Sequence, residues 1–208
     1  MDNYLPENFQ IRKMARDRLR GNWMIPIIVS ILASLLTLAP DRLEDIGRII
    51  SFLIAGPVFW GTSFFFLNFI DTDEAHINNL FSGFKYFGKA LLTNILISFY
   101  VILWSLLFIV PGIIAALKYS QTFYILVENP DLRPNEAISE SKRIMEGYKM
   151  KLFLLGWSFL GWAILSVLSV GIGFIWLIPY ANTTYAYFYK SIRDKGKIFT
   201  EDETEFYF

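Results

Sequence analysis

The sequence predicts an all-α membrane protein, a polytopic helix bundle of about six spans with amphipathic helices at the membrane surface. Its 208 residues are 54% hydrophobic and 18% aromatic, with a mean hydropathy of +0.41. Soluble domains of this length carry more charge and shorter apolar runs. Residues 49–70 contain no charged side chain and would form a helix of about 33 Å, longer than a hydrocarbon core of roughly 30 Å.

Apolar tracts of spanning length occur along most of the chain. A basic amphipathic segment, 1–22, precedes the first tract, and this combination is similar to a signal peptide. The tract lacks a clear small-x-small cleavage site, so we interpret it as a retained helix. The predicted spans are 23–39, 49–70, 90–110, 112–128, 152–170 and 173–190.

A proline–glycine pair, rather than a polar loop, separates the third span from the fourth. Lys118 is the only charge between residues 90 and 127, a stretch too long for one span and long enough for two. Pro111 disfavours helix at the preceding residue and Gly112 tolerates turn dihedrals, so the pair predicts a hairpin turn. Gly171 and Gly173 predict a similar turn between the fifth and sixth spans.

Lysine and arginine are unevenly divided between the two sides of such a bundle. Of the 19, sixteen lie before the first span, in loops 71–89 and 129–151, or from residue 190 onward. Only Arg42 and Arg48 lie on the other side. Because basic residues concentrate in cytoplasmic segments, we expect a multi-pass cell-membrane protein with both termini cytoplasmic, including a tail at 191–208.

Three segments on the basic side are predicted amphipathic helices: the N-terminal segment, 78–89 and 134–149. Their apolar residues recur every three or four positions, between basic ones. Such helices lie in the interface with the apolar face in lipid and the basic face toward anionic headgroups. The expected partners are therefore the lipid bilayer and its anionic lipids. A protein partner or a homo-oligomer stays open, and no nucleic acid is expected.

A short pattern occurs twice and suggests repeated helical-hairpin units. The residues Gly112, Tyr119, Thr122 and Tyr124 recur 61 positions later as Gly173, Tyr180, Thr183 and Tyr185. The first pair of spans fits this unit only in outline. Duplication and chance similarity between apolar sequences both remain open.

Lys118 is the sharpest candidate for a functional residue, because ionisable side chains within spans are rare. It lies about six residues, or roughly 9 Å, below the predicted turn. Its stem is long enough to reach the headgroups. The alternative is an inward bond to Gln121 and to a carbonyl freed near Pro179. Thr122 lies on the same helical face as Lys118 and Gln121.

Other polar side chains within the predicted spans have two interpretations. Such side chains tie membrane helices together by hydrogen bonds, or they line a path for a substrate. With Lys118, Gln121 and Thr122 they form the candidate intramembrane cluster. The additional members are Asn94, Asn182 and Thr183.

The sequence lacks the residues that most enzyme classes need. There is no cysteine and one histidine, and apart from Glu128 at the inner end of the fourth span no predicted span contains aspartate or glutamate. No phosphate-binding glycine loop or HExxH motif occurs. We therefore expect no catalytic residue, no metal site and no cofactor.

The first functional hypothesis is a protein that acts through lipids or a protein partner. Such a protein would serve envelope homeostasis or protect against a membrane-active peptide. The alternative is a small transporter or channel with a polar path near Lys118.

Several motifs together resemble a known family. They are RGNW at 20–23, LFSGFKYFGKAL at 80–91, PGIIAALKYSQTFYILVENPDL at 111–132, EAISESKRIMEGYK at 136–149 and GIGFIWLIPY at 171–180. The chain resembles, over about 20–190, the bacterial integral membrane family known as domain of unknown function 975. The resemblance implies a multi-span cell-membrane protein. It brings no catalytic residues.

Overall fold

The computed structural model describes residues 5–40, 44–72 and 76–205, and only the backbone of 44 and 194–205. Within these ranges the chain is helical and contains no strand. The elements are α1 (Asn8–Leu19), α2 (Met24–Leu38), α3 (Glu44–Asp71), the 3-10 helix η2 (Ile77–Phe81), α4 (Ser82–Lys85), α5 (Phe87–Leu107), α6 (Ile109–Tyr119), α7 (Thr122–Glu128), α8 (Pro134–Ile144), α9 (Lys149–Trp157), α10 (Leu160–Leu168) and α11 (Phe174–Glu205).

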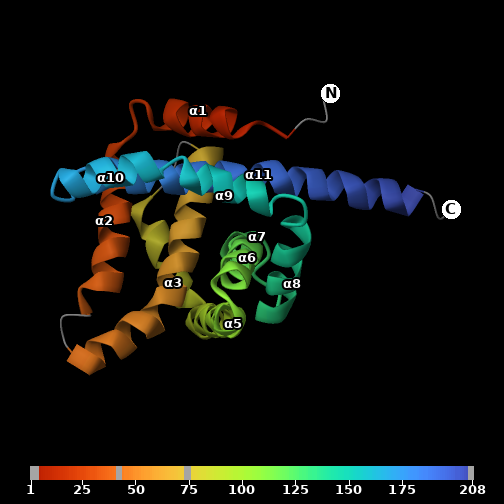
Figure 1. The fold of residues 1–208 in the computed structure, drawn as a ribbon, viewed down its shortest axis with the longest axis horizontal. Coiled ribbons are helices and arrows are strands. Elements are labelled where there is room, and N and C mark those ends of the chain that lie inside the picture. The colour runs from red at the N-terminus through yellow and green to blue at the C-terminus, as the bar shows by residue number, and fades with distance from the viewer. Residues whose placement is uncertain (1–4, 41–43, 73–75, 206–208) are drawn as a thin grey trace.

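The long helices form three hairpins that point in different directions (Figure 1). The first is α2–α3, the second is α5 with α6–α7, and the third is α9–α10 with α11. In Figure 1 the first hairpin runs down the page, the third runs across it, and α5 is seen end-on. Helix α1 bends by 105° from α2 and packs along α11. The hairpins therefore diverge instead of forming a parallel bundle.

In each hairpin the second member along the chain (α3, α6–α7 or α11) is more buried than the first member (α2, α5 or α9–α10). Within the apolar part of α3, 44% of residues are buried, and 39% in α6–α7, against 17% in α5 and 22% in α9–α10. The core is built mainly from aromatic and branched side chains of α3, α7 and α11. Its largest members include Trp60, Phe65, Phe66, Leu126, Phe188 and Tyr189.

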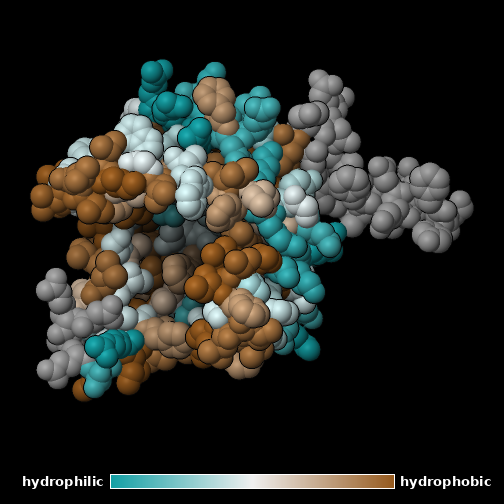
Figure 2. Space-filling view, viewed as in Figure 1, coloured by the Kyte–Doolittle hydropathy of each residue, from teal (hydrophilic) through white to brown (hydrophobic). Residues whose placement is uncertain are grey.

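The first members of the hairpins and the hairpin turns expose large apolar side chains. Leu106 near the end of α5 is 78% exposed, and Val170 between α10 and α11 is 92% exposed. Figure 2 shows hydrophobic surface around the α10–α11 end and mostly hydrophilic surface over α1. Soluble monomers rarely expose apolar patches larger than a few hundred Å². These outer faces are suited to lipid.

Four helices or helix pairs are long and apolar enough to cross a membrane: α3, α5, α6–α7 and α9–α10. The bent pair α1–α2 is a fifth if it counts as one span. Of the six predicted spans, 173–190 falls short of this criterion, and 23–39 meets it only as part of the bent pair, because α2 has 15 residues. The polar residues Tyr180, Asn182, Thr183 and Thr184 lower the hydropathy of α11.

The turn of the second hairpin lies earlier than predicted. Helix α5 ends at Leu107, Phe108 is extended, and α6 begins at Ile109, so Pro111 and Gly112 lie in the first turn of α6. Proline is tolerated there because the first N–H groups of a helix need no intrahelical acceptor. Gly112 serves close packing instead, since a Cβ at this position would collide with Ser105.

The turn of the third hairpin lies where the sequence places it. It falls between Leu168 and Phe174, and Val170 and Gly171 have positive φ. Gly173 packs against Ser166 as Gly112 packs against Ser105. Helix α11 then continues past the predicted end of the sixth span, so the predicted tail 191–208 begins as helix.

The apolar faces of two predicted interfacial helices are covered by protein. Ile11, Ala15 and Leu19 of α1 are fully buried, and α1 packs on α11. The apolar residues of α8, including Ala137 and Ile144, are also buried. These buried side chains of α1 and α8 therefore contact protein rather than lipid, and the position of the two helices at the membrane surface stays a prediction. Segment 78–89 divides into η2, α4 and the start of α5, and it keeps exposed Phe81, Phe84 and Phe87.

Basic side chains fasten the carboxyl ends of the central helices. The Arg18 guanidinium donates from Nε to the Phe69 carbonyl and from Nη2 to the Thr72 carbonyl, both at 2.6 Å. These carbonyls lie at the end of α3, where acceptors lack intrahelical donors and positive charge is favoured. Glu128 at the end of α7 pairs with Arg193 and accepts a hydrogen bond of 2.7 Å from the Tyr189 hydroxyl. Lys190 of α11 pairs with Asp71.

Glycines bring α3 into backbone contact with the segment that follows it. A Cβ at Gly56 would collide with the backbone of Ala90, and one at Gly61 with the backbone of Leu80. A Cβ at Gly83 would collide with the backbone of Pro57. The first and second hairpins can approach this closely only because these side chains are absent.

Gly61→Ala is expected to lower the free energy of unfolding by about 1–3 kcal/mol, because the methyl group overpacks a backbone contact. Gly161→Ala is the matched control, since a Cβ at Gly161 meets nothing within 4 Å. The control should be neutral or gain about 0.5–1 kcal/mol from helix propensity. Thermal unfolding of the purified protein in detergent measures both. Equal melting temperatures for the two variants would contradict the contact.

Candidate functional site

Two cavities of comparable size lie between the helices. The neutral cavity, of about 600 Å³, is lined by residues of α3, α6, α7, α9, α10 and α11 and is open on one side. The basic cavity, of about 650 Å³, lies between α1, α10 and α11. Both volumes are within the range of roughly 300–1,000 Å³ that is typical of ligand pockets.

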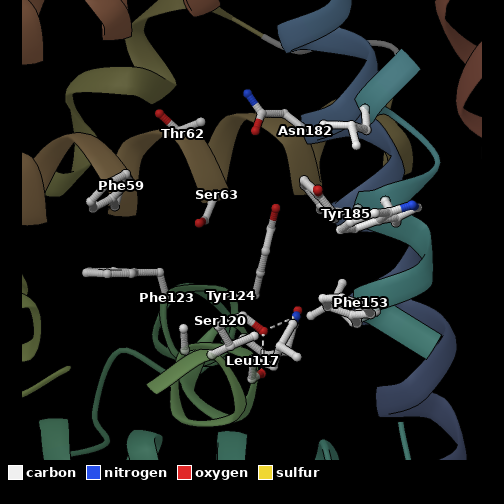
Figure 3. A pocket seen from close by; sticks show the side chains of 17 residues that line it. Phe59, Thr62, Ser63, Leu117, Ser120, Phe123, Tyr124, Phe153, Asn182 and Tyr185 are labelled. Atoms are coloured by element: carbon white, nitrogen blue, oxygen red, sulfur yellow. Dashed lines mark hydrogen bonds between the residues drawn. The ribbon is translucent and has the colours of Figure 1, made fainter. Parts of the chain in front are cut away.

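The neutral cavity receives polar side chains from the second member of all three hairpins (Figure 3). Thr62 and Ser63 come from α3, Gln121 comes from the break between α6 and α7, and Asn182 and Tyr185 come from α11. Its remaining lining is predominantly apolar, and no described lining residue is charged. Such a cavity suits a largely apolar, uncharged molecule.

A hydrogen-bonded link to α8 holds Gln121 in place. The backbone N–H of Gln121 donates to Ser141 Oγ at 3.2 Å, and this hydroxyl donates to the Lys118 carbonyl at 2.8 Å. The side-chain amide donates from Nε2 to Ser120 Oγ at 2.7 Å. Gln121 is 2% exposed, and its Oε1 is buried without a donor among the described residues. The site therefore contains one unsatisfied acceptor.

Lys118 does not belong to either cavity. Its ammonium lies 5.9 Å from the centre of the Trp104 ring on α5 and has no hydrogen-bond partner in the part of the chain that the structure describes. The carbonyl of Pro179, which was a predicted partner of Lys118, accepts a hydrogen bond of 2.7 Å from Thr183 Oγ1. The inward bonding of Lys118 is therefore wrong, and a cation–π contact between α5 and α6 takes its place.

The other predicted site residues separate into two groups. Asn182 joins Gln121 at the neutral cavity. Thr122 is fully buried, and its hydroxyl donates at 2.8 Å to the carbonyl of Tyr119, so it serves its own backbone. Thr183 does the same with Pro179. Asn94 is buried in α5 and lines neither cavity.

Sequence reasoning missed the contribution of α3. The sequence does contain a sign of this contribution. WGTSFF at 60–65 can be aligned with YSQTFY at 119–124, and Thr62 then corresponds to Gln121. Tyr124 and Tyr185, which were noticed only as repeat positions, also line the cavity.

The basic cavity combines two guanidinium groups with aromatic walls. Arg12 and Arg16 project from α1, and Trp23, Trp162 and Trp176 line the same space. The Tyr180 hydroxyl donates to the Arg12 carbonyl at 3.3 Å and fixes α1 against α11. Arg12 Nε is buried without an acceptor among the described residues. Neither arginine was singled out as a site residue by the sequence.

Lys118→Met is expected to leave the stability nearly unchanged, losing only a cation–π contact of about 0.5–1 kcal/mol. Ser141→Ala is the comparison variant, because it removes two buried hydrogen bonds and should cost about 1–3 kcal/mol. Thermal unfolding in detergent distinguishes them. A loss in Lys118→Met as large as that in Ser141→Ala would show that the ammonium has a buried partner.

Comparison with known proteins gives a single result. The family model described as "Protein of unknown function (DUF975)" matches residues 5–118 and 106–196. Neither a curated protein nor a solved structure shows significant similarity to the chain. The matched residues cover most of the chain and include the linings of both cavities. The chain therefore belongs to the DUF975 family of proteins of unknown function.

Proposed function

We propose that this protein is a multi-pass cell-membrane protein that binds an anionic phospholipid in the basic cavity and acts through this binding, without covalent chemistry. One observation carries the proposal: Arg12 and Arg16 share a cavity with three tryptophans. A phosphate group matches the planar fork of a guanidinium, and its oxygens would supply the acceptor that Arg12 Nε lacks.

The walls of the basic cavity suit the rest of such a lipid. Leu165 and Leu177 offer apolar surface beside Trp162 and Trp176. Tryptophan is enriched at the level of the headgroups, where one part of its ring is solvated and the other is in hydrocarbon. A lipid lying between α1 and α10 would thus contact charge at one end and apolar surface at the other.

The proposed topology has six crossings, three outer turns and two cytoplasmic termini, and it requires the divergent hairpins to lie closer to one direction in a bilayer. In Figure 1, α11 ends on the right and the α10–α11 turn lies on the left, at opposite ends of the third hairpin. The low hydropathy of α11 is compatible with a crossing, because Thr183 and Thr184 are fully buried and Asn182 lines a cavity. Helix α2, with 15 residues, would span about 22 Å and is the shortest member.

Duplication of a hairpin unit is supported by matching packing contacts. Gly112 meets Ser105 in the second hairpin, and Gly173 meets Ser166 in the third. In each hairpin the serine hydroxyl donates to the carbonyl four residues earlier, at 2.8 Å for Ser105 and 2.7 Å for Ser166.

The alternative function, a transporter or channel with a polar path near Lys118, has no supporting geometry. Lys118 lies against Trp104, outside the described cavities. An anion path would need its charge to face a cavity.

Replacing both arginines of the basic cavity, Arg12→Gln with Arg16→Gln, is expected to weaken phosphatidylglycerol binding by at least about tenfold, since hydrogen bonds to charged groups contribute about 1.5–3 kcal/mol. Native mass spectrometry of the full-length protein, titrated with phosphatidylglycerol or phosphatidylcholine in detergent, measures this binding. The matched control is Lys13→Gln with Arg20→Gln, which removes two exposed charges, one on α1 and one at its C-cap, that do not line the cavity. Equal losses in the two double variants would show that general charge, not the cavity, binds the headgroup.

A further inference from the structure

We propose that the neutral cavity binds a second kind of ligand, an uncharged lipid with a free hydroxyl group, of which a diacylglycerol is the simplest example. The site is separate from the basic cavity, and no described residue lines both. The proposal rests on the membrane setting of the proposed function but not on its anionic lipid.

The need for a hydroxyl group follows from Gln121. Its Oε1 is a buried acceptor without a donor, and the cavity is the space that the side chain lines. An unsatisfied buried acceptor is costly, and a ligand O–H would satisfy it. The side-chain amide cannot rotate to bring Oε1 to another donor without breaking the hydrogen bond from Nε2 to Ser120 Oγ.

Further polar groups around the cavity are also available to a ligand. Thr62, Ser63 and Asn182 form no side-chain hydrogen bond among the described residues. Most buried hydroxyls elsewhere, such as those of Thr93 and Thr184, donate to the carbonyl four residues earlier in their own helix. Figure 3 shows Thr62, Ser63, Tyr124 and Asn182 around one space. These groups would accept or donate to the hydroxyl and ester oxygens of a glycerolipid.

The absence of charge in the lining excludes a phosphate or an ammonium as the bound group. No described lysine, arginine, histidine, aspartate or glutamate lines this cavity. Burying an ion without an opposite charge would cost far more than hydrogen bonds to neutral groups return. The neutral cavity would thus bind uncharged lipids, and the basic cavity would bind anionic ones.

The rim of the cavity indicates that the ligand enters from the bilayer. Phe59, Ile113, Trp157 and Leu160 line the cavity and are themselves exposed on the apolar surface. An opening framed by such side chains faces hydrocarbon when the hairpins are in a membrane. A lipid would insert an acyl chain past this rim and place its hydroxyl beside Gln121.

Native mass spectrometry of the full-length protein, titrated with 1,2-dioleoylglycerol in detergent, tests the proposal. Wild type should bind one dioleoylglycerol, and equimolar phosphatidylglycerol should not displace it. Gly156→Leu fills the cavity, because a Cβ there lies 3.5 Å from the Tyr185 hydroxyl, and it should weaken binding at least tenfold. Gly161→Leu, on the same hairpin arm in open space, should bind like wild type.

Gln121→Leu provides a second variant in case Gly156→Leu fails to fold. It removes the unsatisfied acceptor and should weaken dioleoylglycerol binding about fivefold, the effect of one hydrogen bond. The double variant Arg12→Gln with Arg16→Gln should bind dioleoylglycerol normally, so failure of the anionic site and failure of this site are distinguishable. Dioleoylglycerol binding no stronger than that of dioleoylphosphatidylcholine, or unchanged in Gly156→Leu and Gln121→Leu, would overturn the proposal.

Discussion

The inward placement of polar side chains on the second member of each hairpin is the constraint on which the rest of the structure depends. Thr62, Gln121 and Asn182 lie on three different second members and line the same cavity. A polar side chain facing hydrocarbon is costly, so these members must be central and the first members peripheral. The burial of α3 compared with α5 agrees with this order. The apolar outer surface and the neutral cavity are two consequences of one arrangement.

The termini reinforce this arrangement from one end. Arg18 holds the carboxyl end of α3, and Arg193 and Tyr189 hold Glu128 at the end of α7. Helix α1 therefore covers the core instead of lying free in the interface. Its position along α11 also creates the basic cavity, since Arg12 and Arg16 come from α1 and Tyr180 comes from α11. The same contacts thus serve stability and the proposed lipid binding.

Sequence patterns predicted the helical class and the hairpins well, because long apolar tracts and their interruptions depend on local composition. They predicted details less well where tertiary packing decided. Pro111 was compatible with a turn and with the first turn of a helix, and the close approach of Gly112 to Ser105 selected the second. The apolar faces of α1 and α8 matched lipid and protein equally, and only the fold shows that protein covers them.

The candidate site was predicted in part for a similar reason. Gln121 and Asn182 were identified because polar residues in apolar tracts are conspicuous. Lys118 was equally conspicuous, but its helical face is determined by the contact with Trp104. Thr62 and Ser63 were missed because small hydroxyl residues are common in apolar helices, and the only signal for them is the alignment of 60–65 with 119–124. Their role depends on which side of α3 meets α7 and α11.

Accessibility of single cysteines in intact cells tests most directly whether the three hairpins enter the membrane from one side. The chain has no native cysteine, so each introduced thiol is the only one. Asp45→Cys and Val170→Cys lie at the start of α3 and in the α10–α11 turn, and both positions are exposed. The account predicts that an impermeant thiol reagent labels these two variants, and labels Lys195→Cys, far along α11 from the α10–α11 turn, only after the cells are opened. Labelling of Lys195→Cys in intact cells, or of Asp45→Cys without Val170→Cys, would contradict it.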